Sequence, residues 1–266
     1  MAIFNKVKIA WFGKHFGEEP PLVGDKNQGA GGIFFSGCNL RCVFCQNWQI
    51  SQNGMGKEYS AEELADIMLD LQKQNVVNID LVTPSNWWPE IIFAIKSAKR
   101  RGLKIPVVWN SNAYERVEII KKLTGLVDMY LPDFKYGLDE SAKKYSNAVN
   151  YPAIAEAAIR EMYRQVGIQG LIVRHMILPN NLNNSFKALE IISKMDKNIS
   201  VSLMRQYYPC HQAEKFPEIN RRITDEEFTK VFDKMIALGF LNGWTQKKNC
   251  EKIFMPDFFK AKPFKN

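Results

Sequence analysis

Six apolar segments along the chain each precede a segment with helical periodicity, and this alternation constrains the fold more than any other feature. The expected strands are Gly31–Ser36, Val76–Val82, Ile105–Trp109, Val127–Leu131, Leu171–Leu178 and Ile199–Met204. Repeated strand–helix units are typical of α/β proteins with a parallel sheet. Six units are two fewer than a closed eight-stranded barrel contains. The pattern therefore predicts an α/β fold, a partial (β/α)6 TIM-like barrel with a wide lateral opening.

The expected helices begin at recognisable capping signals. Capping boxes start three of them, at Ser60–Glu63, Asn112–Glu115 and Thr224–Glu227. In such a box a side-chain oxygen and a carboxylate three residues later satisfy the first backbone amides of the helix. Three further helices are expected, one that begins near Pro89 and stops at Gly102, one at Ile154–Val166 and one at Ser185–Met195.

Two segments fall outside the alternation and divide the chain into three parts. Residues 1–28 contain Glu18-Glu19-Pro20-Pro21 and predict an irregular N-terminal arm, residues 29–246 form the barrel, and residues 247–266 form a basic, aromatic C-terminal tail. The tail phenylalanines are expected to pack onto the barrel: Phe254, Phe258, Phe259 and Phe264. A chain of 266 residues is long enough for one barrel but too short for a large second domain.

The net charge of +8 and the pI near 9.1 permit attraction to acidic partners. The basic residues are dispersed along helices and the tail, without the aromatic-interleaved stripe that reads nucleic acid, so no nucleic-acid partner is expected. No signal peptide and no apolar run of membrane length stand out, so no membrane partner is expected either.

Three cysteines follow the first expected strand directly. Cys38, Cys42 and Cys45 have the spacing C-x-x-x-C-x-x-C. Three thiolates can hold three irons of a [4Fe–4S] cube and leave the fourth iron open to another ligand. A structural zinc site would need a further ligand knuckle, whereas Cys210 and Cys250 are isolated in sequence. The reduced thiolates favour a cytoplasmic location.

Several motifs in order along the chain resemble one family of enzymes. Besides the cysteine loop they are Asp80-Leu81-Val82-Thr83-Pro84, Tyr130-Leu131-Pro132-Asp133-Phe134-Lys135, Arg174-His175 and Gln206-Tyr207-x-Pro209. Together they resemble radical S-adenosylmethionine (SAM) proteins related to the pyruvate formate-lyase activating enzyme. The resemblance runs from about Trp11 to Gln246 and implies a barrel of the radical SAM type. The Gly-Gly-Glu sequence common after the second strand of this superfamily is here Thr83-Pro84-Ser85.

This resemblance implies a radical SAM oxidoreductase. Its [4Fe–4S] cluster would cleave SAM reductively to methionine and a 5′-deoxyadenosyl radical that abstracts hydrogen, as in glycyl-radical activases. The implied partners are a glycyl-radical protein or another macromolecular substrate, and a low-potential electron donor such as flavodoxin or ferredoxin. Modification of a small molecule remains an alternative, and a metal-binding scaffold without catalysis is a third reading.

The ends of the second and third strands carry candidate SAM ligands. Thr83 and Ser85 offer hydroxyl and carbonyl oxygens to the SAM ammonium, although Thr83-Pro84 could simply end a strand. Asn110 and Ser111 end the third strand, where the resembling activases hold the SAM carboxylate and a monovalent cation. The alternative there is a plain helix-entry turn with Asn112 as its cap.

The later strands add further candidates. Asp133 ends the fourth strand, with either a functional role or a structural ion pair with a lysine. By resemblance Arg174 points toward SAM, His211 contacts it and Phe44 packs near the adenine, whereas His175 is expected in the barrel wall. The aromatic residues of the loops line the substrate opening or fill the core: Trp87, Trp88, Trp109 and Tyr114.

Overall fold

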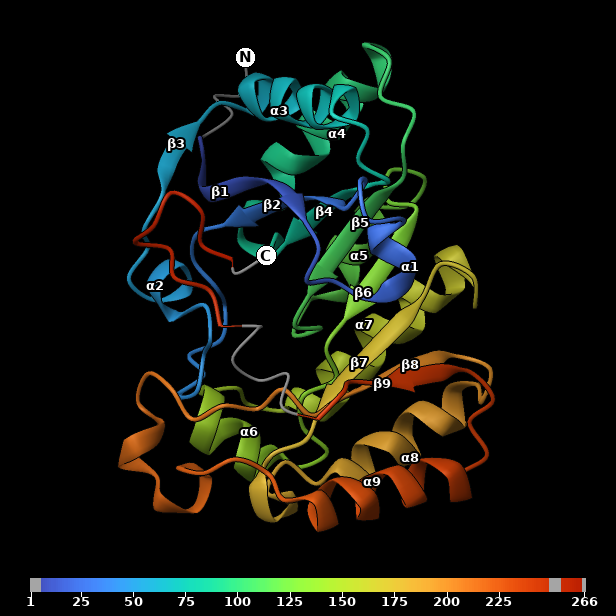
Figure 1. Cartoon of the computed structure of the whole chain (residues 1–266). Coiled ribbons are helices and arrows are strands. Elements are labelled where there is room, and N and C mark those ends of the chain that lie inside the picture. Colours follow the sequence, from blue (N-terminus) through green and yellow to red (C-terminus); the bar gives the residue numbers. More distant parts are fainter. Residues whose placement is uncertain (1–5, 249–254, 265–266) are drawn as a thin grey trace.

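The computed structural model describes residues 6–248 and 255–264. Six strands run parallel and correspond to the six expected from the sequence: β2 (Ala30–Phe35), β4 (Ile79–Val82), β5 (Val107–Ser111), β6 (Met129–Pro132), β7 (Ile172–Met176) and β8 (Ser200–Met204). Helices cover the outer face of this curved sheet, and the interior opens to one side (Figure 1). The predicted partial TIM-like barrel is thus confirmed.

The strands form two hydrogen-bonded sheets that meet between β6 and β7. The sheet orders are β3-β1-β2-β4-β5-β6 and β7-β8-β9. Two parallel bridges join them, Tyr130 with Leu171 and Asp133 with Arg174. The Phe134 amide donates to the Arg174 carbonyl at 2.8 Å. The curved arrangement is therefore continuous, and Asp133 and Arg174 are adjacent although 41 residues separate them.

A seventh parallel strand, β9 (Gly243–Thr245), was not expected from the sequence. It extends the barrel beyond β8, and Gly243 makes this close pairing possible. A Cβ atom at position 243 would lie 2.2 Å from the Val201 carbonyl oxygen, and its φ of +137° also favours glycine.

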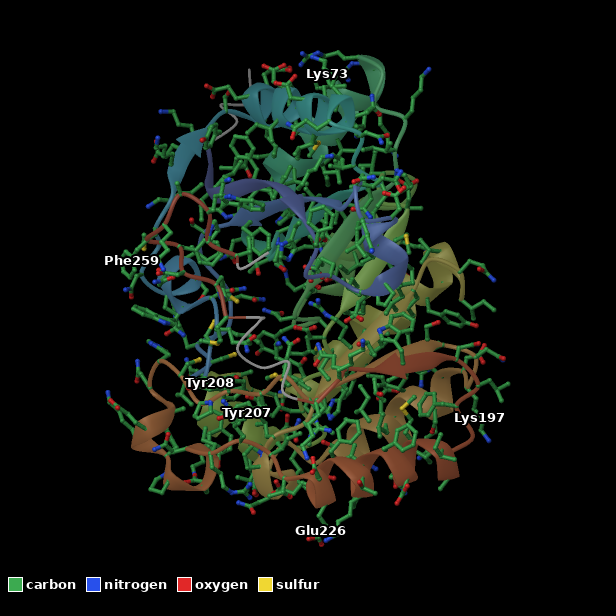
Figure 2. All side chains as sticks on the ribbon, viewed as in Figure 1. Lys73, Lys197, Tyr207, Tyr208, Glu226 and Phe259 are labelled. Carbon is green, nitrogen blue, oxygen red and sulfur yellow. The ribbon has the colours of Figure 1, made fainter. Side chains whose placement is uncertain are left out.

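The helices lie mainly between the strands. The α-helices are α1 (Pro20–Val23), α2 (Trp48–Ser51), α3 (Ala61–Lys73), α4 (Trp88–Arg100), α5 (Val117–Lys122), α6 (Asp139–Ser146), α7 (Tyr151–Val166), α8 (Ser185–Met195) and α9 (Asp225–Ala237). Short 3-10 turns are η1 (Ser85–Trp87), η2 (Pro179–Asn181), η3 (Ala213–Lys215) and η4 (Pro217–Ile219). Lys73 of α3 and Glu226 of α9 mark opposite ends of the molecule (Figure 2). Among the described residues no helix is long and apolar enough to cross a bilayer.

Two of the three expected capping boxes are confirmed, at Ser60 and at Thr224. The third is wrong. Asn112 accepts instead from the Tyr114 amide at 2.9 Å, and Ala113 has a φ of +59°. A left-handed residue interrupts helical geometry, so α5 begins only at Val117.

Within the described part of the N-terminal segment, residues 6–28, regular elements form, and the prediction of an irregular arm is wrong there. Strand β1 (Val7–His15) pairs antiparallel with β2 and also with β3 (Lys57–Tyr59). Helix α1 then places Leu22 against the interior residues of the barrel: Val108, Leu131 and Ile172. The segment therefore covers one edge of the sheet and closes part of the barrel interior.

The described part of the C-terminal tail packs onto this N-terminal region. Phe264 lies edge to face with Trp11 at 5.0 Å between ring centroids, and Phe258 is 9% exposed beside Phe34. The Phe258 amide donates to Gln49 at 2.7 Å. The expected packing is thus observed for these two phenylalanines, whereas Phe259 is 68% exposed and Phe254 lies outside the described residues.

Candidate active site

A cavity of about 870 Å³ occupies the barrel at the carboxyl ends of the parallel strands. Functional groups collect at this end of parallel barrels because the strand-to-helix loops all face it. Nine of the eleven sequence-predicted site residues line the cavity: Cys38, Cys42, Phe44, Cys45, Thr83, Asn110, Ser111, Asp133 and Arg174. Ser85 and His211 are not among its lining residues.

The cysteine loop is held in place by helix α6. Gly37 leaves β2 with a φ of +83°, which glycine adopts without strain. The Arg41 and Val43 amides then donate to the Ser146 and Tyr145 carbonyls at 2.9 and 2.8 Å. These bonds fix the loop so that all three thiols line one cavity.

Hydrogen-bond donors surround the cysteine sulfurs. Cys38 Sγ accepts from the Asn112 amide group at 3.3 Å, Cys42 Sγ accepts from the Ser146 hydroxyl at 2.9 Å, and Cys45 Sγ lies 3.2 Å from the Ser51 hydroxyl. Burial raises the pKa of the Cys42 thiol to about 11 and that of Cys45 to about 12 in the metal-free protein. Iron binding must therefore displace protons from these thiols.

The three thiols fit an iron–sulfur cube better than a mononuclear metal. Among the described residues no group of three His, Cys, Asp or Glu side chains could hold a metal ion. In a cube, however, each thiolate binds a different iron, so the sulfurs need not converge on one point. Lys135 acts electrostatically on Cys42 and lines the same cavity, and so offsets the negative charge of a thiolate cluster.

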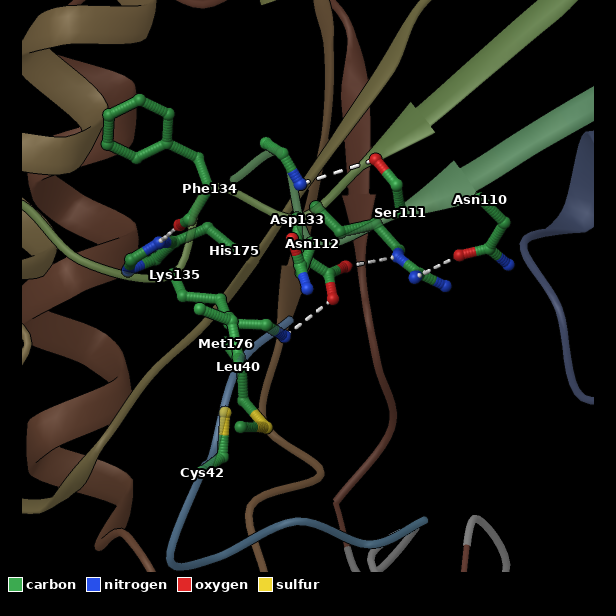
Figure 3. Close-up of polar contacts among 12 residues, drawn as sticks. Leu40, Cys42, Asn110, Ser111, Asn112, Asp133, Phe134, Lys135, His175 and Met176 are labelled. Carbon is green, nitrogen blue, oxygen red and sulfur yellow. Dashed lines mark hydrogen bonds and ion pairs between the residues drawn. The ribbon is translucent and has the colours of Figure 1, made fainter. Parts of the chain in front are cut away.

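A row of charged side chains leads away from the cysteine loop. The two carboxylate oxygens of Asp133 form ion pairs with Lys135 Nζ and Arg174 Nε, each with a nitrogen–oxygen distance of 2.6 Å. Arg174 also donates to Asn110 Oδ1 at 2.6 Å. Burial alone would raise the pKa of Asp133, but the two cations hold it below its usual value. Figure 3 shows Cys42, Lys135, Asp133 and Asn110 following one another across the site.

The sequence analysis left open a functional role or a lysine ion pair for Asp133. The structure contains the pair with Lys135 and adds a second with Arg174, both inside the cavity wall. Asp133 therefore forms a structural ion pair and also lines the cavity, so the pair does not exclude a functional role. Asp133 remains a predicted SAM-orienting residue.

Two predicted site residues, Ser85 and Ser111, donate hydrogen bonds to Glu115. The sequence analysis named Glu115 only as part of a capping box. This buried carboxylate accepts from the Ser85 hydroxyl at 2.8 Å, the Ser111 hydroxyl at 2.6 Å and Trp109 Nε1 at 3.1 Å. The two serine hydroxyls are thus already engaged by Glu115, although Ser111 lines the cavity. Thr83 does line the cavity and has a φ of +59°, which is strained for a β-branched residue.

Phe44 and His211 lie in different surroundings. Phe44 lines the cavity and packs edge to face with Tyr207, with 5.5 Å between ring centroids. His211 stacks on Trp48 at 5.3 Å, and its φ is +57°. The His211 ring therefore contacts an aromatic neighbour rather than the cavity formed by the described residues.

Other candidates are structural. His175 is fully buried, with Nδ1 2.6 Å from the Phe134 carbonyl oxygen and Nε2 2.8 Å from the Ser185 hydroxyl, as expected for a barrel-wall histidine. The four aromatic residues expected in the loops pack against or within the core, and two of them lie in β5 and α4 instead. None is a cavity-lining residue among those described: Trp87, Trp88, Trp109 and Tyr114. Cys210 donates to the Phe44 carbonyl at 3.3 Å, and Cys250 lies outside the described residues.

Sequence reasoning missed the acidic residues that β1 and α1 deliver. Glu18 Oε2 lies 3.1 Å from Arg174 Nη1, and Glu19 accepts from Trp244 Nε1. Both line the cavity. Asp80 is a third missed acid, since it appeared only within a family motif. Its signal was a carboxylate in the middle of an apolar strand, which is costly unless it has a partner.

Comparison with known proteins identifies the family. A family model described as the Radical SAM superfamily matches residues 33–190. The uncharacterized protein MJ0674 of Methanocaldococcus jannaschii is 36% identical over 241 residues, covering 86% of this chain and 68% of its own. The pyruvate formate-lyase-activating enzyme of Clostridium pasteurianum is 27% identical over 184 residues, covering 67% and 74% of the two chains.

Solved structures share the fold at low identity. The hydrogenase maturase HydG has a TM-score of 0.54 at 16% identity, covering 78% of this chain and 48% of its own. TYW1 has a TM-score of 0.52 at 14% identity, covering 87% and 83%. This chain thus spans about half the length of HydG, and its match to TYW1 extends over most of both chains. The chain belongs to the radical SAM superfamily and is an enzyme in which an iron–sulfur cluster serves to cleave SAM.

Proposed function

We propose that this enzyme abstracts hydrogen from its substrate in the manner of a glycyl-radical activase. The likeness to the Clostridium enzyme over two thirds of the chain supports this assignment. The observation that carries it is a single wide cavity lined by three cysteine thiols and by the Asp133–Arg174 ion pair. A polypeptide loop or a smaller molecule could enter such a cavity, so modification of a small molecule is the second candidate.

In this proposal Cys38, Cys42 and Cys45 hold a [4Fe–4S] cluster with one open iron. When bound, the cluster supplies the electron that splits a carbon–sulfur bond of SAM, and the carbon radical released takes hydrogen from the substrate. The electron comes from a low-potential donor such as flavodoxin or ferredoxin. Because the cysteines must stay reduced to bind iron, the proposal places the protein in a reducing compartment such as the cytosol.

The surrounding residues orient the amino-acid end of SAM. Arg174 donates through its three nitrogens to Asp133, Asn110 and Glu18, so its guanidinium is fixed in position before a ligand arrives. A preorganised donor loses little free energy on binding a carboxylate. Phe44 offers an apolar surface to the adenine, and Thr83 offers oxygen atoms to the SAM ammonium. Asp133 orients the amino-acid end of SAM indirectly, through its ion pair with Arg174. The alternative is that Asp133 binds a monovalent cation that bridges it to SAM.

Anaerobic reconstitution tests the cluster assignment. We expect about four irons and four sulfides per chain, from the three-cysteine argument. Alanine at Cys38, Cys42 or Cys45 should each abolish the cluster. Cys210→Ala is the matched control and should retain full iron content. A triple alanine variant that still holds the same cluster would refute the ligand assignment.

SAM cleavage and hydrogen abstraction need separate assays. The reduced protein should release 5′-deoxyadenosine and methionine from SAM slowly without substrate, and methylthioadenosine as the main product would contradict the radical mechanism. A glycyl-radical protein encoded beside this one is the substrate to try. A glycyl radical signal on that partner by electron paramagnetic resonance would establish the activase role, and its absence with competent SAM cleavage would favour the small-molecule alternative.

A further inference from the structure

Helix α2 connects the cysteine loop to the outside of the molecule. Cys45 Sγ lies 3.2 Å from the Ser51 hydroxyl at the end of α2, and the Cys45 carbonyl accepts from the Trp48 amide at its start, at 3.3 Å. One α-helical turn rises only about 5.4 Å. Side chains on the outer side of α2 therefore lie at the end of a short path through the protein to Cys45.

Three aromatic rings from three separate segments meet on this outer side. Trp48 stacks on His211 with 5.3 Å between ring centroids and packs edge to face with Phe259 at 6.5 Å. Trp48 and His211 are half-buried, whereas Phe259 is 68% exposed, more than any other aromatic side chain among the described residues. We call these three residues the aromatic face. Exposed apolar side chains that gather in one place often mark a site of interaction.

The C-terminal tail is attached to α2, and this attachment keeps Phe259 beside Trp48. The Gln49 side chain accepts from the Phe258 amide at 2.7 Å and donates to Asp257 Oδ1 at 3.3 Å. Figure 1 shows the tail running next to α2, and Figure 2 shows Phe259 at the outer edge of the same side. The neighbouring contacts thus hold Phe259 in its exposed position.

Basic side chains border the aromatic face. The segments that form and border it, residues 38–51, 206–216 and 255–264, carry four basic and two acidic side chains: Arg41, Lys215, Lys260 and Lys262 against Glu214 and Asp257. Asp257 already pairs with Lys260 at 3.3 Å. Lys215 and Lys262 have no carboxylate partner among the described residues. The region around the face therefore has an excess of positive charge, which attracts an acidic protein.

The aromatic face stays accessible when the cavity is filled. The thiols of Cys38, Cys42 and Cys45 line the cavity that SAM and the substrate would occupy, whereas the three residues of the aromatic face are not among the described residues that line it. An electron donor that acts while SAM is bound must reach the cluster from outside the cavity. The short path from the aromatic face to Cys45 is such a route.

We propose that the aromatic face docks an acidic electron-carrier protein, with flavodoxin as its representative. The rings supply the apolar contact, and the basic residues at the border steer the carrier toward it. The step moves one electron and no atom, so the carrier is oxidised by one electron and the cluster is reduced by one. Electron-transfer complexes commonly bury less than about 1,200 Å², so a small face suffices. This inference rests on the proposed function in one respect, that a carrier protein reduces the cluster.

The first test measures binding of oxidised flavodoxin to the cluster-loaded protein by isothermal titration calorimetry at low salt. Phe259→Ala and Lys215→Glu should each weaken binding at least fivefold, about 1 kcal/mol. Added salt should weaken wild-type binding because exposed charges are screened, and it should weaken binding of Lys215→Glu less. All variants are first shown to keep wild-type iron content.

Two matched controls make the same changes at exposed positions outside the aromatic face. Phe12→Ala removes a ring that is 41% exposed on β1, and Lys96→Glu reverses an exposed charge on α4. Both should bind flavodoxin like the wild type. The second control separates a local effect of Lys215 from a change in the net charge of the protein.

A comparison of two reductants separates docking from cluster chemistry. With dithionite, which needs no docking face, Phe259→Ala and Lys215→Glu should cleave SAM at the wild-type rate. With reduced flavodoxin at limiting concentration, the same variants should be at least fivefold slower. Loss of cleavage with both reductants in the wild type would be a failure of the proposed function, and the binding measurement would still test the docking face independently.

Three results would overturn the inference. They are a wild-type protein that binds neither flavodoxin nor a ferredoxin, controls that weaken binding as much as Phe259→Ala and Lys215→Glu do, and flavodoxin-driven SAM cleavage that is unchanged in both of those variants. Dimers of the wild type in size-exclusion chromatography that disappear in Phe259→Ala would assign the aromatic face to a second copy of this chain and reject the carrier.

Discussion

Replacing Asp133 by asparagine should destabilise the protein strongly, because it leaves two buried cations without their shared partner. Asp133 is 14% exposed, and Lys135 and Arg174 are 20% and 15% exposed, with nitrogen–oxygen distances of 2.6 Å. Removing one member of such a buried pair costs about 3–5 kcal/mol of unfolding free energy. Arg174 keeps Glu18 at 3.1 Å, whereas no other carboxylate pairs with Lys135 among the described residues. We therefore expect a loss near 3 kcal/mol.

A double-mutant cycle with Arg174→Met tests this reasoning. The double variant should lose less stability than the sum of the single losses, by about 1–3 kcal/mol, because the two residues are in direct contact. Urea denaturation of the cluster-free proteins, followed by circular dichroism under reducing conditions, gives the four unfolding free energies. Additivity within about 0.5 kcal/mol would refute the coupling.

The same substitution separates a structural from a functional Asp133. In cluster-loaded Asp133→Asn we expect unchanged iron content and weaker SAM binding, because Arg174 loses one of the groups that fix it. A SAM affinity unchanged within about twofold, ~0.4 kcal/mol, would remove Asp133 from the proposed SAM site and leave it as a structural residue.

Three further predictions concern the framework. The His175 pKa, lowered by burial from 6.5 to about 4, means that the folded protein favours neutral imidazole. The stability this provides is complete above pH 6.5 and is lost as the pH falls toward 4. Between these two pH values the unfolding free energy of the cluster-free wild type should therefore fall by roughly 3 kcal/mol more than that of His175→Asn. Thr224→Ala should remove the capping box of α9 and lower the unfolding free energy by about 1 kcal/mol, measured with urea. Phe258→Ala should cost about 3 kcal/mol and speed tryptic cleavage in the tail, whereas the exposed Phe259→Ala should change stability by less than about 0.5 kcal/mol.

The parts of the site that follow from parallel topology could be predicted from the sequence. The C-x-x-x-C-x-x-C spacing and its place after the first strand are local signals. Asp133 was predicted at the cavity because parallel strands end on the same side of a sheet, and Arg174 by resemblance to the family. The two side chains do meet in the cavity wall.

The parts that depend on tertiary contacts could not be predicted. Nothing local in Met1–Gln28 reveals that β1 pairs antiparallel with β2 and brings Glu18 to Arg174. Ser85 and Ser111 stood at the right strand ends, but the side chain of Glu115 captures both hydroxyls. Because the Ala113 backbone is left-handed, α5 begins at Val117 and not at the expected capping box. No propensity rule assigns that conformation to alanine.

Strand β1 also covers the edge of an apolar strand. All six residues of β2 are buried, and they include the apolar run Ile33-Phe34-Phe35. On one side β2 pairs with β4, and on the other β1 satisfies its edge (Figure 1). An apolar strand with an open edge pairs readily with other chains. A protein trimmed to the part matched by the family model, which begins at residue 33, would lose β1 and is expected to self-associate.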